Sequence, residues 1–246
     1  MFKKFVGALS ILSFAAVVFA GDALSVDYSK KVFPTRIRYG KQTIFNNIKL
    51  RPDCKFRSVK EERAVRWNVT GSKTVKKGEC TEHIIIGNIV SGAGEILLDC
   101  TINVQEYKEK LQFCIDSSVK KEVFSYHYPV YWAMSIPQEQ IRGRGVQLIR
   151  QGAEQNILLP AAYGKRLKLI GETLNLAFPS VTLSVKAGAD TELRLEDNRN
   201  WDKNNFHFQC YSAKFPWSNK PQKIAAGTRI VWSFSMSEFQ PKAEED

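Results

Sequence analysis

Residues 230–236 read IVWSFSM, a run in which apolar and polar side chains take turns. Residues 181–186, VTLSVK, alternate in the same way. Successive side chains of a β-strand point to opposite faces of its sheet, so this alternation is typical of a strand with one face in a core and the other in water. Two packed layers of such strands make a sandwich. The two runs therefore predict a β-sandwich.

Short runs rich in β-branched and aromatic residues recur along the chain, separated by Gly, Pro, Asn and Ser. They cover residues 83–90, 95–104, 123–134, 167–170, 180–186, 206–211 and 228–236. Helical periodicity is weak, and its best candidate, residues 138–155, contains Gly143, Gly145 and Gly152, which would destabilise a helix interior. The sequence thus predicts a mainly β protein.

Residues 137–155 are the best candidate for a linker, because they are polar and contain several glycines. The segments on either side, residues 21–136 and 156–246, are each close to the ~100 residues of an immunoglobulin-like sandwich. We expect an N-terminal and a C-terminal β-sandwich domain of this kind. The alternative is one larger sandwich or barrel in which residues 137–155 form a long loop.

The first 20 residues have the pattern of an export signal. Lys3 and Lys4 precede an apolar run that ends in small residues, and cleavage is expected after Ala20. The run is shorter than the ~20 apolar residues that a membrane-spanning helix needs, and no later stretch is apolar enough. We expect an exported protein, periplasmic or secreted, with no transmembrane span.

Five cysteines follow the leader: Cys54, Cys80, Cys100, Cys114 and Cys210. In an oxidising compartment we expect disulfides, and the odd cysteine could join two chains into an oligomer. If residues 96–104 and 110–115 are two strands that turn about Tyr107, Cys100 and Cys114 lie opposite each other, and they are our favoured disulfide. A short helix around Tyr107 would also let its ends approach.

Basic residues are concentrated in one part of the chain. The whole sequence has 36 Lys and Arg against 25 Asp and Glu, a net charge of +11, whereas residues 30–77 alone hold fifteen basic and three acidic residues interleaved with aromatic ones. Such a surface would bind an anionic partner, for which lipopolysaccharide, an acidic glycan and lipid head groups are candidates. The candidate binding residues here are Arg36, Arg38, Lys55, Arg57, Arg63, Arg66 and Trp67. Alternatively, these basic residues occupy the water-facing positions of half-buried strands.

No local catalytic motif is present: the sequence has no GxSxG, HExxH, GxxxxGK[ST] or CxxC. Cys80 with His83, and His207 with Cys210, have a matching spacing that could form a zinc site, but residues three apart on a strand face opposite sides. We expect no metal, no cofactor and no catalytic residue. The leading hypothesis is an exported, non-enzymatic binding protein of the cell envelope or extracellular space. A membrane-active toxin and a hydrolase with catalytic residues far apart in the sequence are alternatives.

Two short segments have strand-like patterns, residues 35–39, TRIRY, and residues 111–120, LQFCIDSSVK. They resemble the first strand and the long edge strand of periplasmic pilus chaperones of the chaperone–usher family, which are basic, exported proteins with two immunoglobulin-like domains. The resemblance implies that Arg36 and Lys120 hold the C-terminal carboxylate of a pilus subunit while the edge strand completes the subunit's sheet. A pilus-assembly chaperone, with an envelope or pilus subunit as partner, is therefore the second hypothesis.

Overall fold

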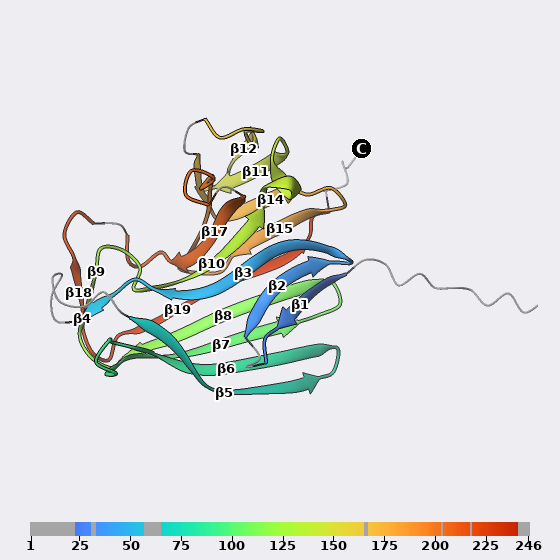
Figure 1. Ribbon diagram of the computed structural model, residues 1–246. Coiled ribbons are helices and arrows are strands. Elements are labelled where there is room, and N and C mark those ends of the chain that lie inside the picture. Colours follow the sequence, from blue (N-terminus) through green and yellow to red (C-terminus); the bar gives the residue numbers. More distant parts are fainter. Residues whose placement is uncertain are drawn as a thin grey trace, which may run out of the picture.

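The structure is a computed structural model that describes residues 23–30, 33–56, 65–164, 167–202, 204–216 and 218–240 (Figure 1). Its strands form three sheets in which neighbouring strands run antiparallel, so the predicted mainly β class is confirmed. The described helix, α1 (Gln138–Ile141), has four residues. Within the described residues no helix has the length and apolar character to cross a membrane. The expected export signal, residues 1–20, lies outside them.

The largest sheet has nine strands. In spatial order they are β12 (Ala153–Leu158), β11 (Gly145–Arg150), β14 (Thr173–Ala177), β15 (Thr182–Ala187), β19 (Arg229–Glu238), β8 (Lys110–Val119), β7 (Ile96–Glu106), β6 (Cys80–Val90) and β5 (Arg66–Lys77). In Figure 1, the green strand β8 lies between β7 and the red strand β19.

A seven-stranded sheet forms the second layer. Its spatial order is β1 (Leu24–Tyr28), β2 (Pro34–Tyr39), β3 (Gln42–Pro52), β10 (Val130–Pro137), β17 (Asn205–Ser212), β16 (Thr191–Glu196) and β13 (Lys168–Gly171). A small third sheet has the order β18 (Gln222–Ile224), β9 (Val123–Ser125) and β4 (Lys55–Phe56).

The core lies between the two large sheets. On β19, every second residue of the run is buried, namely Ile230, Trp232, Phe234 and Met236. The residues between them, Val231, Ser233 and Ser235, are half-buried, which is the alternation that the sequence predicted. The ring of Phe113 on β8 stacks on Phe234 of β19 with centroids 4.6 Å apart, and it also contacts Trp132 of β10 at 5.7 Å. Because Trp132 belongs to the seven-stranded sheet, these contacts tie the two layers together. The predicted sandwich architecture is therefore present.

Strands from both halves of the chain share both large sheets. β10 pairs with β3 and with β17, and β19 pairs with β8 and with β15. The structure thus differs from the expected division into two domains and corresponds to the alternative of one larger sandwich.

The expected linker, residues 137–155, forms α1, β11 and the start of β12. Its glycines serve turns: Gly143 and Gly152 have φ values of 68° and 77°, which glycine adopts without steric cost. Five of the six residues of β12 are exposed, because β12 is the edge strand of its sheet. An exposed edge hairpin with glycine turns has the same polar composition as a linker.

Candidate functional site

A row of polar side chains crosses the nine-stranded sheet on the face opposite the core, which we call the polar face. The strand register aligns Gln105 of β7 with Gln112 of β8, Gln112 with Ser235 of β19, and Ser235 with Lys186 of β15. On β8 and β19 the neighbours of these residues in sequence, such as Phe113 and Phe234, point into the core. Strand alternation therefore builds the polar face from residues between the core positions.

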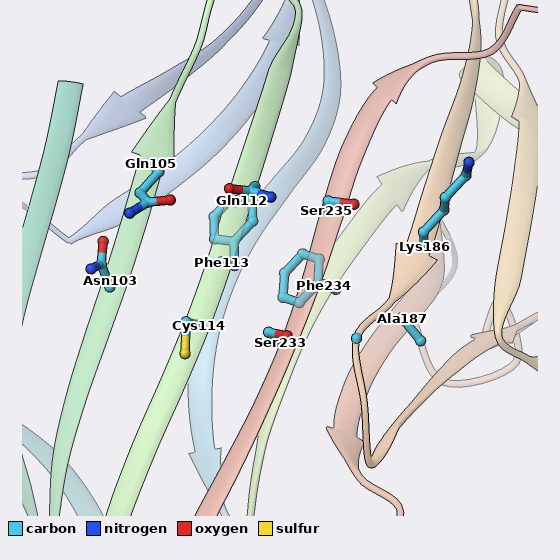
Figure 2. A pocket seen from close by; sticks show the side chains of 11 residues that line it. Asn103, Gln105, Gln112, Phe113, Cys114, Lys186, Ala187, Ser233, Phe234 and Ser235 are labelled. Atoms are coloured by element: carbon cyan, nitrogen blue, oxygen red, sulfur yellow. The ribbon is translucent and has the colours of Figure 1, made fainter. Parts of the chain in front are cut away.

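A pocket of about 310 Å³ opens on the polar face between β7, β8, β19 and β15; we call it the central pocket. Its polar lining residues are Asn103, Gln105, Gln112, Cys114, Lys186, Ser233 and Ser235. Figure 2 shows the amides of β7 on one side of the pocket and Lys186 of β15 on the other. The lining is thus rich in amides and hydroxyls and contains one lysine.

Glu82 of β6 orients the amides of β7. One of its carboxylate oxygens accepts hydrogen bonds from Nδ2 of Asn103 at 2.6 Å and from Nε2 of Gln105 at 3.3 Å, and the other lies 2.5 Å from Nζ of Lys77. The hydrogen bond from Lys77, followed by those from the two amides, lowers the pKa of Glu82 to about 2. The carboxyl group is therefore ionised at neutral pH.

An ionised carboxylate only accepts hydrogen bonds, so the NH₂ group of Asn103 must face Glu82 and its carbonyl oxygen must face away. This oxygen, Oδ1 of Asn103, is buried and has no protein partner. An unpaired buried acceptor is costly, and a ligand hydroxyl or a water molecule that donates to it removes that cost. The carbonyl oxygen of Asn103 is therefore oriented to accept a hydrogen bond from a ligand in the central pocket.

Two other carboxylates of the polar face are held in ion pairs. Asp116 forms a two-point pair with Arg229, at 3.0 and 2.6 Å, and Asp99 lies 2.9 Å from Nζ of Lys120. The hydrogen bonds that Arg229 donates to Asp116 raise the pKa of Arg229. Lys120 was predicted to bind the carboxylate of a partner subunit, but it is paired with Asp99 of its own chain.

The other predicted binding residues are distributed over three sheets. Arg36 is exposed on β2, where Arg38 pairs with Asp27 at 2.7 Å. Lys55, on β4, lies 5.6 Å from the ring centroid of Tyr126. On β5, Arg66 is exposed and Trp67 packs partly against the core. Arg57 and Arg63 lie outside the described residues. The structure does not gather the described members of this set into one site.

The chaperone-like features are not arranged as that resemblance implied. β8, which contains most of residues 111–120, is paired along both edges, with β7 and with β19. A strand with both edges occupied cannot complete the sheet of a partner. Arg36 and Lys120 belong to different layers, since β2 is in the seven-stranded sheet and Lys120 follows β8.

The expected Cys100–Cys114 disulfide is not formed, and all five cysteines are free. The register pairs Cys100 with Ser117 and Asn103 with Cys114, because the hairpin turn is centred after Tyr107 rather than on it. Cys100 therefore points into the core while Cys114 points to the polar face. Within the described residues, no group of three His, Cys, Asp or Glu side chains is arranged to hold a metal ion.

Sequence reasoning missed the polar row of the central pocket. Glu82, Asn103 and Lys186 were each visible as polar positions within alternating strands, but such positions normally face water. Only the register of five strands places them on one face around one pocket. The strict alternation of apolar and polar residues along β7, β8 and β19 could have indicated them, because it shows which residues of each strand lie on the face opposite the core.

Comparisons with known proteins concern the fold. The sequence matches no protein-family model, and no curated protein is significantly similar to it. The structure is similar to that of the Slr1438 protein of Synechocystis sp. PCC 6803, with a TM-score of 0.56 and 10% identity over 89% of this chain and 92% of that one. It is also similar to a candidate aldose 1-epimerase of Escherichia coli K12, with a TM-score of 0.55 and 10% identity over 90% of this chain and 97% of the other.

These similarities correct the functional interpretation of the sequence. The leading hypothesis of a non-enzymatic binding protein is contradicted, because the structure shares its fold with a candidate aldose 1-epimerase. The second hypothesis of a pilus chaperone is contradicted as well, because both edges of β8 are paired within the protein. At 10% identity the likeness shows the fold, and the chemistry must be argued from the residues of this chain.

Proposed function

We propose that this protein is a carbohydrate-processing enzyme that binds its sugar in the central pocket. The observation that carries the proposal is the Glu82-anchored amide of Asn103, whose buried Oδ1 has no protein partner. Sugars present hydroxyl groups that both donate and accept, and amides and hydroxyls offer both functions within one pocket. The fold shared with a candidate aldose 1-epimerase supports a sugar as the ligand.

Lys186 is the proposed proton donor. It is exposed and lines the central pocket on the side of β15. Exchange between the anomers of a sugar needs one proton delivered to the ring oxygen as the bond from C1 to that oxygen breaks, and one withdrawn from the anomeric hydroxyl. The ammonium group of Lys186 can deliver the first, and water in the open pocket can take the second. Ring closure returns both protons.

Glu82 has a positioning role in this proposal. Four strand steps separate β6 from β15, about 19 Å at the usual spacing of ~4.8 Å between strands. Glu82 and Lys186 therefore cannot act on the same atom pair of one sugar ring. Because its oxygens are already occupied by Lys77, Asn103 and Gln105, Glu82 fixes the amides that recognise the sugar.

The test is the rate of anomer exchange, followed by NMR after a single anomer of D-glucose or D-galactose is dissolved with the enzyme. We expect the wild type to accelerate exchange, and Lys186→Ala to lose about 100-fold or more of that acceleration, the usual contribution of a general acid. Lys49→Ala is the matched control, because Lys49 is an exposed lysine on β3 in the other sheet. A wild type that neither binds nor converts these sugars, or a Lys186→Ala variant as active as Lys49→Ala, contradicts the proposal.

Export to the periplasm or beyond, and an anionic partner for the basic residues between 30 and 77, remain predictions of the sequence. They are compatible with a sugar substrate, since acidic glycans belong to the expected partners. Comparing binding of a neutral and a sulfated form of one oligosaccharide, over a range of salt concentrations, tests the anionic partner.

A further inference from the structure

A second pocket lies on the same polar face, at the edge formed by β11 and β12; we call it the edge pocket. Its volume is about 500 Å³. Its lining combines amides with apolar side chains, namely Gln147, Asn156, Asn175, Ile157, Leu158 and Phe239.

The amides of the edge pocket, like those of the central pocket, are oriented by a carboxylate, here through a chain of two hydrogen bonds. The carboxylate of Glu154 accepts from Nε2 of Gln147 at 3.1 Å, and Oε1 of Gln147 accepts from Nδ2 of Asn175 at 2.6 Å. Because a carboxylate only accepts, this chain fixes both amides and turns Oδ1 of Asn175 away from Gln147. Asn175 is only 4% exposed and its Oδ1 has no protein partner.

The apolar residues of the edge pocket complement these amides. Leu158 is 73% exposed, which is unusual for a leucine, and Phe239 is anchored by its backbone N–H, which donates to the carbonyl of Thr182 at 2.7 Å. A sugar ring has hydroxyls around its rim and C–H groups on its faces. An amide acceptor beside exposed apolar side chains matches both parts.

The two pockets are connected along β15. Lys186 lines the central pocket and Thr182 lines the edge pocket, and the two residues point to the same side of the strand. They are four positions apart on the strand, about 13 Å at ~3.3 Å per residue. Between them lies Ser184, which is opposite Asn175 and whose buried hydroxyl also has no partner.

We infer that the edge pocket is a second sugar subsite and that the substrate is an oligosaccharide or a longer glycan that extends from the central pocket to the edge pocket. This inference rests on the proposed function, because the sugar that binds in the central pocket is taken to be one end unit of that glycan. The carboxylate-anchored amide of each pocket receives a hydroxyl of a different sugar unit.

The test measures binding of D-glucose and of malto- and cello-oligosaccharides of two to six units by calorimetry, with D-galactose and β-1,4-galacto-oligosaccharides as a second series. We expect affinity to rise about tenfold or more at the length that reaches the edge pocket, the gain from one or two additional good contacts. Leu158→Ser should abolish that rise without changing the affinity for the monosaccharide, and Asn175→Ala should do the same. Leu158 is exposed, so its substitution leaves the fold intact.

Two failures are distinguishable. If the monosaccharide binds but affinity does not depend on length, or if Leu158→Ser and Asn175→Ala weaken the monosaccharide and the oligosaccharides equally, the second subsite is overturned and the central site stands. If the wild type binds no saccharide of either series, the proposed function falls, and the subsite falls with it. A matched control is Ile86→Ser, which removes another exposed apolar side chain that lines neither pocket.

Discussion

Nδ2 of Asn103 lies 2.6 Å from a carboxylate oxygen of Glu82, and this contact leaves the carbonyl oxygen of Asn103 buried without a protein partner. The hydrogen-bond acceptor available to a ligand, Oδ1 of Asn103, is thus oriented by Glu82, which lies on the strand next to the pocket. Residues that shape the site through such contacts can be tested separately from those that line it.

Acid should remove the stabilising contribution of Glu82. Its pKa is about 2 in the folded protein, against an ordinary value of 4.5, so its contribution is complete above pH 4.5 and declines as the pH falls toward 2. Urea unfolding of the wild type and of Glu82→Gln should show a difference in the free energy of unfolding that is constant above pH 4.5 and shrinks below it. A difference that does not change with pH would show that Glu82 is not ionised in this arrangement.

Gly87→Ala should destabilise the fold by about 1–3 kcal/mol, the usual cost of overpacking. A methyl group on Gly87 would lie 2.4 Å from the backbone oxygen of Asn68 and 2.4 Å from the ring of Trp67. Gly71→Ala is the control, because a methyl group there meets nothing within 4 Å on the neighbouring strand β5. Thermal and chemical unfolding of both variants test this, and equal losses of stability would contradict it.

Arg199→Met should cost about 3–5 kcal/mol, because it leaves a buried carboxylate unpaired. The guanidinium group of Arg199 forms a two-point pair with Asp197, at 2.9 and 2.7 Å, and donates to the carbonyls of Pro160 and Ala161. It also lies 4.6 Å from the ring centroid of Phe206. The double variant Asp197→Leu with Arg199→Met should recover part of the loss, since neither charge is then buried alone. No recovery in chemical unfolding would mean that the carbonyl contacts dominate.

Thiol reagents should modify Cys114 first. It is exposed at the central pocket, where reagents can reach it, although partial burial raises its pKa. Cys54 and Cys100 are buried, and burial raises the pKa of both thiols to about 12 and keeps them protonated. Mass spectrometry after brief labelling should find Cys114 modified, and a sugar bound in the central pocket should slow this reaction. Cys114→Ser should remove the fast phase. Rapid labelling of Cys100 in the folded protein would contradict the assigned register.

The class of fold could be predicted from local patterns, but the pairing of strands could not. Alternation along residues 230–236 identified β19 because burial follows that alternation directly. Its partner β8 is more than a hundred residues earlier in the sequence, and nothing in either strand alone specifies the other. The wrong prediction of a Cys100–Cys114 disulfide has the same cause. A small shift in the centre of the hairpin turn changes the register and so places the two cysteines on opposite faces of the sheet.

The candidate site depended on the same missing information. Gln105, Gln112 and Ser235 are ordinary polar residues in their own strands, and they form a row only once three strands are in register. The high frequency of basic residues between 30 and 77 predicted a binding surface there. Those basic residues that the structure describes are distributed over different sheets. A cluster in sequence is not a cluster in space when the chain changes layer between neighbouring strands.

The pairing of β19 has a consequence for synthesis of the protein. β19 lies between β8 and β15, and both of these strands precede it in the chain. A nascent chain that has not yet released residues 229–238 from the ribosome therefore holds two sheet fragments with unfilled edges, which are open to aggregation and accessible to chaperones. The nine-stranded sheet can be completed only after β19 has emerged, so its two fragments stay separate until this last described strand has been synthesised.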